Sequence, residues 1–359
     1  MPALRDFIEA LDKRGNLKRI QKKVDWKYEI GTIARETKTP LLFENIKDYP
    51  KARLFTNGLV DYASISLALG IQKDDGRFDD LVEVIKCGFK NPIKPVLTNR
   101  PQGFENRITQ SIDLTALPVP WWSEIDASRY IGTWHLNISR DPETGVRNIG
   151  VYRMQIVAPN QTTVSVSPGS HLALQIRKAE KNNEALPMAV AIGVDERLIM
   201  SAASAPAYGI DEYALAGGIS GRPIELVRCA TQPLEVPVDS EIIIEGFIKP
   251  GVQVQDGPFL DYAGIPSTNP LAHLFEVTAL FFKNDFIFRG SAVGRPGAED
   301  HQLYSILSRA GLADFHGSRI RHSMQTFLLR RRAFKTFQLT GRIGKFTRGT
   351  KRNVSQGDI

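Results

Sequence analysis

The chain has 359 residues, of which 42% are hydrophobic and 24% are charged, and this composition excludes a largely disordered protein. No apolar run approaches the roughly 18 residues of a membrane span, so the sequence predicts none. The formal net charge of +7 is concentrated at one end, since residues 317–359 contain 11 Lys and Arg but a single acid. A basic tail without a recognition motif predicts no specific nucleic-acid binding.

The cysteine content argues for a reducing environment. Cys87 and Cys229 are far apart and lack the spacing of metal ligands, which predicts neither a disulfide framework nor a zinc site. The first residues form an amphipathic pattern that contains acids, unlike a signal peptide. We therefore expect a cytoplasmic protein.

The N-terminal third alternates between helical and strand patterns. A helix is predicted from the spacing of three and four between Leu4, Phe7, Ile8 and Leu11. Gly15 follows where this helix would end. A short apolar run at 40–43 predicts a strand, and a second helical pattern covers 81–89. This alternation predicts an α/β domain over residues 1–115.

Beyond residue 116 the sequence changes to short segments rich in Val, Ile, Tyr and Thr, many of them bounded by turn residues. These segments predict strands at 133–140, 148–156, 163–166, 188–193 and 242–248. Helices are predicted at 171–182 and 211–216. We therefore expect a mainly antiparallel β domain over residues 116–305, a barrel being one form of it, followed by a short basic segment over 306–359.

Three local patterns contain residues that enzymes use. In the segment NIGVYR, alternation along a strand would place Asn148 and Arg153 on opposite faces. His171 lies at a predicted helix start, where free N–H groups favour an anion such as phosphate. Asp256 and Asp261 flank a predicted Gly-Pro turn. Each pattern alone is also typical of an ordinary strand end, capped helix or surface turn.

Together these patterns suggest a catalytic site. Two carboxylates near an arginine can hold different protonation states, because the cation stabilises the charge of one of them. Asn, His and Glu side chains offer the oxygen and nitrogen ligands that Mn²⁺ or Mg²⁺ accepts. Glu212 is the third ligand that we expect, the alternative being an acid that stabilises a helix N-terminus. The sequence contains no HExxH, GxSxG or P-loop motif.

Over residues 1–300 the sequence resembles the UbiD-like decarboxylase family. The motifs that carry the resemblance are PLLFENI, NIGVYRMQ, a histidine 18 residues after Arg153, DEYALAG with LEVP after it, and EGFI with DGPFLDY. The resemblance implies an N-terminal α/β domain and a split β-barrel of the flavin-reductase type that binds the cofactor. It also implies a C-terminal α/β domain that is largely absent from this chain.

The resemblance implies a reversible, non-oxidative decarboxylase that acts on an aromatic or α,β-unsaturated acid through a covalent adduct with prenylated FMN. Mn²⁺ (or Mg²⁺) would be bound by Asn148, His171 and Glu212, and K⁺ near Ala203 and Ser204. The residues that would bind the prenylated FMN are Asn148, Val151, Tyr152, Arg153, Ser170, His171 and Glu212.

The same resemblance assigns catalysis to Arg153, Asp256 and Asp261, with Asp261 as the proton donor. The family more often has glutamate at the first acid, so the shorter Asp256 predicts either a longer contact with Arg153 or a closer loop. The implied partners are a small carboxylic acid, CO₂, a flavin prenyltransferase that supplies the cofactor, and further copies of the chain in a homo-oligomer.

Several alternatives stay open at this point. The chain could be a non-catalytic or partner-dependent subunit of a multi-subunit carboxylase, or a different flavoprotein such as an FMN-dependent reductase. The basic C-terminus is compatible with a natural short form, a truncated reading frame or one subunit of several. Residues 299–303 either line the pocket as a loop or begin an ordinary helix.

Overall fold

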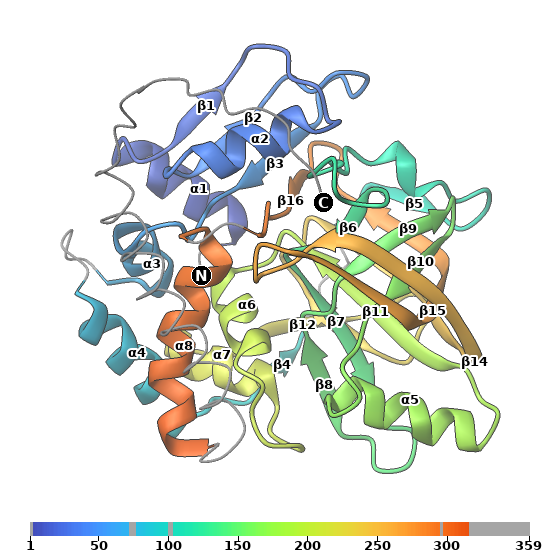
Figure 1. Ribbon diagram of the computed structural model, residues 1–359. Coiled ribbons are helices and arrows are strands. Elements are labelled where there is room, and N and C mark those ends of the chain that lie inside the picture. The colour runs from blue at the N-terminus through green and yellow to red at the C-terminus, as the bar shows by residue number, and fades with distance from the viewer. Residues whose placement is uncertain (1–2, 72–76, 100–102, 295–296, 316–359) are drawn as a thin grey trace, which may run out of the picture. The chain divides into compact units, whose positions relative to one another are not determined.

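The centre of the protein is a curled antiparallel sheet of nine strands among the described residues of the computed structural model (Figure 1). The structure describes residues 3–71, 77–99, 103–294 and 297–315. The strand order is β6-β9-β10-β15-β14-β11-β7-β8, and β5 pairs with β15. The strands are β5 (Asn106–Ile108), β6 (Tyr130–Gly132), β7 (His135–Arg140), β8 (Arg147–Gly150), β9 (Met154–Ala158), β10 (Gln161–Val164), β11 (Leu186–Ile192), β14 (Ile242–Leu260) and β15 (Pro266–Phe282).

A very short piece of chain connects the two edges of this sheet. β8 is an edge strand that ends at Gly150, and β9, beside the opposite edge strand, begins at Met154. Four Cα–Cα steps span at most about 15 Å, so the sheet must curl until its edges approach each other. The prediction of one continuous strand over 148–156 is therefore wrong, because residues 151–153 cross between the edges.

Strand β11 is buried on both faces, which explains its continuous apolar sequence. Met188 and Val190 belong to the core that the sheet shares with α5 (His171–Lys181). Ala189 and Ala191, which point the other way, belong to a second core. The helices in that core include α1 (Leu4–Lys13), α3 (Tyr62–Leu69), α4 (Phe78–Lys90), α6 (Glu196–Ala203) and α7 (Glu212–Ser220). Leu303, Ile306, Leu307 and Ala310 of the last described helix belong to it as well.

Two smaller sheets complete the fold. The N-terminal sheet has the order β1-β2-β3-β16, and its last strand comes from far along the chain. The third sheet has the order β13-β12-β4. The remaining elements are β1 (Lys18–Ile20), α2 (Glu29–Glu36), β2 (Leu41–Phe43), β3 (Arg53–Thr56), β4 (Val96–Leu97), η1 (Leu114–Ala116), β12 (Glu225–Arg228), β13 (Glu235–Pro237), β16 (Ile287–Arg289) and α8 (Glu299–Phe315).

The strand pairing links the N-terminal part of the chain to the rest. β5 lies before residue 115 and pairs with the central sheet, whereas β16 returns to the N-terminal sheet and runs parallel to β3. The described residues up to Gly311 form one compact unit, and beyond it only the end of α8, residues 312–315, is described. The domain limits at residues 115 and 305 stay predictions, and most of the predicted segment 306–359 lies outside the described residues.

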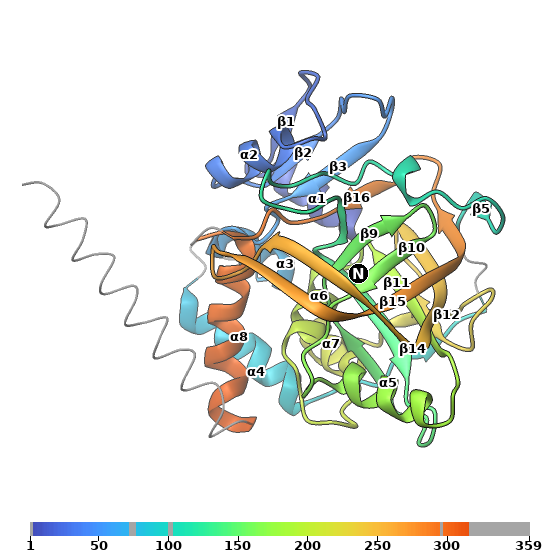
Figure 2. The same cartoon turned by 45° about the vertical axis from the view of Figure 1, so that its right-hand side comes forward.

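Most of the predicted helices and strands are present, with different lengths. The helices predicted at 81–89, 171–182 and 211–216 are confirmed as α4, α5 and α7, which differ at their ends. The strand predicted at 242–248 is the first third of β14, which continues to Leu260. Figure 2 shows β14 and β15 running side by side as two long strands, as their antiparallel pairing requires.

Glycines allow α4 and α7 to pack closely. A Cβ atom at Gly218 would lie 2.1 Å from the carbonyl oxygen of Gly88. Because neither backbone can move without separating the helices, we expect Gly218→Ala to lower the free energy of unfolding by about 1–3 kcal/mol. Urea unfolding measures this, with Gly103→Ala as the control, since a Cβ atom at Gly103 meets nothing within 4 Å. Equal urea midpoints for Gly218→Ala and Gly103→Ala would contradict the close packing of α4 against α7.

Candidate functional site

A buried aspartate and an arginine form the centre of the site. The Oδ1 atom of Asp256 lies 2.6 Å from both Nε and Nη2 of Arg153, and its Oδ2 accepts a 2.6 Å hydrogen bond from the Thr163 hydroxyl. Of the two alternatives predicted for this shorter acid, the short distances exclude the longer contact and leave the closer loop. Burial raises the pKa of Asp256, and the hydrogen bond from Thr163 and the charge of Arg153 oppose that rise.

The second aspartate is more exposed. Asp261 Oδ2 lies 3.7 Å from Arg153 Nη1, and the Ser267 hydroxyl bridges the two groups. This hydroxyl accepts a 2.6 Å hydrogen bond from Arg153 and donates a 2.8 Å hydrogen bond to Asp261. The side chain of Asp261 is 41% exposed, whereas that of Asp256 is 0% exposed. One arginine thus contacts two carboxylates that differ in access to solvent.

The Gly-Pro pair between these aspartates does not form the predicted turn. β14 continues through Gly257 and Pro258, whose peptide bond is cis, and the pairing with β15 shifts register there. Gly257 has φ +99°, and its N–H donates a 2.8 Å hydrogen bond to Gln155 Oε1. A residue with a Cβ atom would meet the backbone of Ser267 at 2.6 Å, so this close pairing of strands requires glycine.

A mainly apolar cavity of about 320 Å³ lies against the acid–arginine network. Of the predicted site residues, Val151, Arg153 and Asp261 line it. Asp300 and Leu303 also line it from α8, so the predicted segment 299–303 is both a helix start and part of the wall. Ala203, beside which K⁺ is predicted, lines it too, and the remaining predicted site residues do not.

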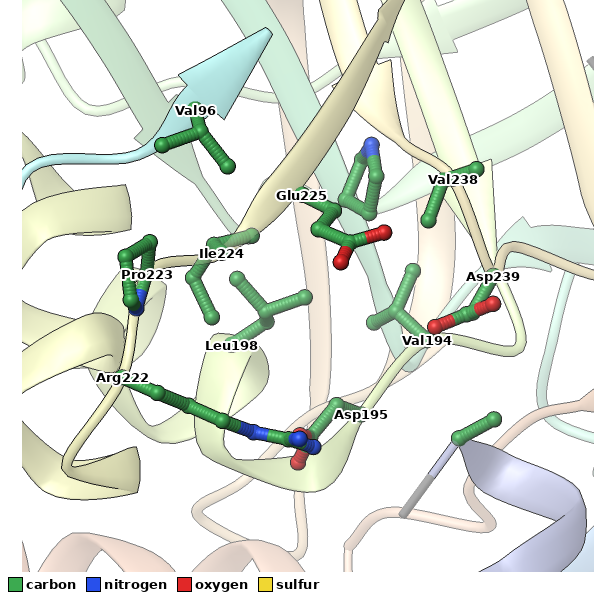
Figure 3. Close-up of a pocket in the computed structure, with 12 residues that line it drawn as sticks. Val96, Val194, Asp195, Leu198, Arg222, Pro223, Ile224, Glu225, Val238 and Asp239 are labelled. Carbon is green, nitrogen blue, oxygen red and sulfur yellow. The ribbon is translucent and has the colours of Figure 1, made fainter. Parts of the chain in front are cut away.

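A larger cavity of about 440 Å³ lies elsewhere, between α6 and the strands β12 and β13 (Figure 3). In Figure 3 the Arg222 side chain extends toward Asp195, and Glu225 and Asp239 lie on the opposite side. No predicted site residue lines this cavity. The acid–arginine network therefore identifies the smaller cavity as the candidate active site.

The predicted metal ligands Asn148 and Glu212 are brought together by their neighbours. Arg147, which precedes Asn148 on β8, donates a 2.6 Å hydrogen bond to Asp211, which precedes Glu212 on α7. The Glu212 carboxylate accepts a 3.1 Å hydrogen bond from the backbone of Ile149. Burial raises the pKa of Glu212 to about 8. A carboxylate buried in this way favours a cation beside it.

Tyr152 connects this region to the first turn of α5. Burial raises the pKa of Tyr152, and its hydrogen bonds to the Asn148 side chain, to the backbone of Leu172 and to the Ser170 side chain oppose the rise. His171 is the first residue of α5, and its ring lies 5.1 Å from that of Tyr208. The structure therefore places Asn148 and the start of α5 around one phenol group.

This donor set fits a divalent cation. An amide oxygen, an imidazole nitrogen and a buried carboxylate suit Mn²⁺ or Mg²⁺. In the part of the chain that the structure describes, no three His, Cys, Asp or Glu side chains cluster as metal ligands. The predicted set contains only two residues of these types, because its third member is Asn148.

Sequence reasoning did not find several polar residues of the site. Thr163, Gln155 and Ser267 lie on strands, where one hydroxyl or amide among many gives no signal of its own. Ser267 is only six residues from Asp261, and the two meet because the end of β14 pairs with the start of β15.

Thr163→Val removes a hydroxyl donor from Asp256 while keeping the side-chain shape. We expect the pKa of Asp256 to rise further and the free energy of unfolding to fall by about 1–3 kcal/mol. Because this pKa is higher in the folded state, stability should fall as pH rises between the unfolded and folded values, and the fall should be larger in the variant. Urea unfolding between pH 4 and 8 measures both effects.

Thr162→Val is the matched control for this prediction. Thr162 is also fully buried on β10, but its hydroxyl has no hydrogen-bond partner among the described residues. Removing that hydroxyl should be neutral or stabilising. Equal losses of stability in the two variants would contradict the role given to Thr163.

Comparison with known families tests the resemblance. Residues 95–296, more than half of the chain, match the 3-octaprenyl-4-hydroxybenzoate carboxy-lyase (UbiD) Rift-related domain, and residues 8–85 match the N-terminal domain of the same family. The chain belongs to the UbiD family. The resemblance drawn from the sequence motifs is thereby confirmed.

Relatives of this UbiD-family chain include enzymes with named substrates. A phenolic acid decarboxylase of Bacillus subtilis (strain 168) is 32% identical over 315 residues, which are 84% of this chain and 66% of the relative. An evolved dimeric form of the UbiD-class enzyme HmfF from Pelotomaculum thermopropionicum, in complex with prFMN, is 30% identical with a TM-score of 0.78. That match covers 86% of this chain and 70% of HmfF.

Vanillic acid decarboxylase of Sedimentibacter hydroxybenzoicus in its closed form has a TM-score of 0.82 at 26% identity, over 86% of this chain and 67% of that enzyme. The UbiD-family chain thus spans about two thirds of the length of these relatives. The predicted mixed fold with a curled antiparallel sheet agrees with them. Within the described residues, no helix is long and apolar enough to cross a membrane.

Proposed function

We propose that this protein catalyses the reversible, non-oxidative decarboxylation of an aromatic or α,β-unsaturated carboxylic acid. The observation that carries the proposal is the network of Arg153, Asp256, Ser267 and Asp261 at the wall of an apolar cavity. A guanidinium suits a substrate carboxylate, and the apolar walls suit an unsaturated carbon skeleton. The phenolic acid and vanillic acid decarboxylases among the relatives support this class of substrate.

The two aspartates have different roles in this proposal. Arg153 orients the substrate carboxylate, while buried Asp256 holds the guanidinium in place. Asp261 in its acid form donates a proton to the carbon that has lost CO₂, and its exposed side chain takes another proton from solvent. The substrate carboxylate plus one proton gives CO₂ and the product with a new C–H bond, so the balance requires no oxidant or reductant. The same groups serve the reverse reaction.

Prenylated FMN is the cofactor that we propose, because loss of CO₂ from an sp² carbon needs an electron sink that side chains lack. Asn148, His171 and Glu212 would bind Mn²⁺ (or Mg²⁺) beside the cofactor phosphate. The N-terminus of α5 at Ser170 favours that phosphate. Residues 151–153 would contact the flavin. The prFMN complex of HmfF and the buried Glu212 support this assignment.

The remaining proposals concern organisation. We assign residues 1–115 to an N-terminal α/β domain, 116–305 to a split β-barrel that binds the cofactor, and 306–359 to a short basic segment. K⁺ near Ala203 and Ser204, a flavin prenyltransferase as cofactor supplier, and a homo-oligomer are part of the proposal. The curled sheet supports the barrel, and the dimeric form of HmfF supports self-association.

Coexpression with a flavin prenyltransferase tests the proposal. Denaturing mass spectrometry should detect prenylated FMN, and the protein should release CO₂ from an aromatic acid and incorporate deuterium from D₂O at the same carbon. Full activity with unmodified FMN and a nicotinamide reductant would favour an FMN-dependent reductase instead. Activity that appears only after partner subunits are added would favour a partner-dependent carboxylase subunit.

A further inference from the structure

A fully buried arginine lies behind the walls of the candidate cavity. Arg289, at the end of β16, is 1% exposed. Its Nε donates a 2.8 Å hydrogen bond to Glu196, and its two terminal nitrogens donate hydrogen bonds of 2.9 Å and 2.6 Å to Glu299. Both glutamates are buried as well, at 2% and 0% exposure. One guanidinium therefore connects α6 to α8.

On the α6 side the network ends at an aromatic wall. The indole Nε1 of Trp134 donates a 2.8 Å hydrogen bond to Glu196, and Trp134 lines the cavity. The guanidinium of Arg289 also lies 4.6 Å from the centroid of the Trp134 ring, within range of a cation–π interaction. The indole is thus fixed both by its N–H group and by its face.

On the other side the network fixes the start of α8. Glu299 is the first residue of this helix, and its carboxylate accepts 3.1 Å hydrogen bonds from the backbone N–H groups of Asn57 and Leu59. The next turn supplies cavity walls at Leu303 and Tyr304. Since the helix begins at the anchored residue, the position of these side chains depends on Glu299.

Stability alone is a weak explanation for this arrangement. Burying three charged groups costs desolvation energy, and an apolar cluster of the same volume is often as stable or more so. An arginine can contact both carboxylates and the indole at once, because its guanidinium is planar and carries five donors. A lysine has a single ammonium group and cannot hold both carboxylates in the same geometry.

We propose that Arg289 is a positioning residue that sets the separation between Trp134 and α8, and through it the size of the ring that the cavity accepts. This inference rests on the proposed function, since the walls select an acid only if the acid binds between them. Glu196 and Glu299 transmit the position of Arg289 to the two walls.

Arg289→Lys tests the inference, with Arg197→Lys as the matched control. Arg197 is also buried and contacts a buried carboxylate, Asp195, through two nitrogens at 3.0 Å and 2.8 Å. Unlike the network of Arg289, this pair includes no residue that lines the candidate cavity. The measurements are kcat/KM for benzoate and for 2-naphthoate with the cofactor-loaded protein, the Kd of both acids by calorimetry, and Tm. We expect Arg289→Lys to change the ratio of kcat/KM for benzoate to kcat/KM for 2-naphthoate about tenfold or more. Arg197→Lys should leave that ratio unchanged.

Glu196→Gln keeps the inference testable if Arg289→Lys does not fold. Trp134 and Arg289 donate to different oxygens of Glu196, and an amide replaces one of these oxygens with a donor. One of the two hydrogen bonds is therefore lost, and the ratio should change in the same way. The inference is overturned if Glu196→Gln or Arg289→Lys lowers Tm as Arg197→Lys does but leaves the ratio of kcat/KM for the two acids unchanged. The proposed function would then stand. Wild-type protein that binds both acids without decarboxylating either would overturn the proposed function, and the Kd ratios would still decide the inference. Failure to bind either acid would overturn both.

Discussion

Asp261→Asn is expected to reduce kcat for decarboxylation by about 10²–10⁴-fold, because an amide cannot return a proton to the carbon that has lost CO₂. The substitution keeps the side-chain length, and its oxygen can still accept the hydrogen bond from Ser267. KM should change much less than kcat, since Arg153 and the cavity walls remain. The measurement is CO₂ release and deuterium incorporation from D₂O by protein loaded with prenylated FMN.

Asp261→Glu is the control for this prediction, because it restores an acid at the same position. Its activity should exceed that of Asp261→Asn by at least about tenfold. Normal deuterium incorporation in Asp261→Asn would assign the proton to another group. In that case Asp256, the other carboxyl that contacts Arg153, would be the next candidate.

Glu212→Gln is expected to lower the affinity for Mn²⁺ by more than the roughly 10–100-fold that loss of an outer-shell partner costs. Bound prenylated FMN should fall with it, because the ion links protein and phosphate in our proposal. The measurement is metal content and flavin absorbance after gel filtration. Tight retention of the flavin by the variant would remove Glu212 from the ligand set. Arg147→Gln, which removes the ion pairs to Asp211 and Glu235 but none of the proposed ligands, should have a smaller effect.

The protonation of Glu212 gives the same prediction a pH dependence. Its pKa is raised from 4.5 to about 8 by burial, so the folded state binds this proton more tightly than the unfolded state. Metal-free protein should therefore lose stability as pH rises between these values, by about 5 kcal/mol. Mn²⁺ affinity should increase over the same interval, since the proton and the cation compete for the carboxylate. Urea unfolding with EDTA or Mn²⁺ measures both, and Glu212→Gln should abolish the slope.

The sequence was informative where a local pattern has a local cause. Helices α4 and α5 have apolar residues at helical spacing, and a serine caps α5 as an acid caps α7. The set of Arg153, Asp256 and Asp261 came from the resemblance to a family. Their contact depends on the long pairing between β14 and β15, which joins residues across a hairpin.

The rest could not be predicted because it depends on distant contacts. The middle of β14, residues 249–255, has only exposed and half-buried residues, a pattern that is equally typical of a loop. It is a strand because β15 pairs with it. The break after Gly150 follows from the curling of the sheet and not from a local breaker. Arg289 contacts Glu196, 93 residues earlier, so no window of sequence contains both.

The short connection between β8 and β9 limits how this protein can vary. Inserting or deleting one residue among Val151, Tyr152 and Arg153 would turn the side chains that follow it to the opposite face of the sheet, or would force one edge strand to shift register. Either change would separate Tyr152 from Asn148, or Arg153 from Asp256. Substitutions in α6 and α8 carry no such constraint. New substrates should therefore arise by replacing side chains in those helices, while the length of this three-residue connection stays fixed.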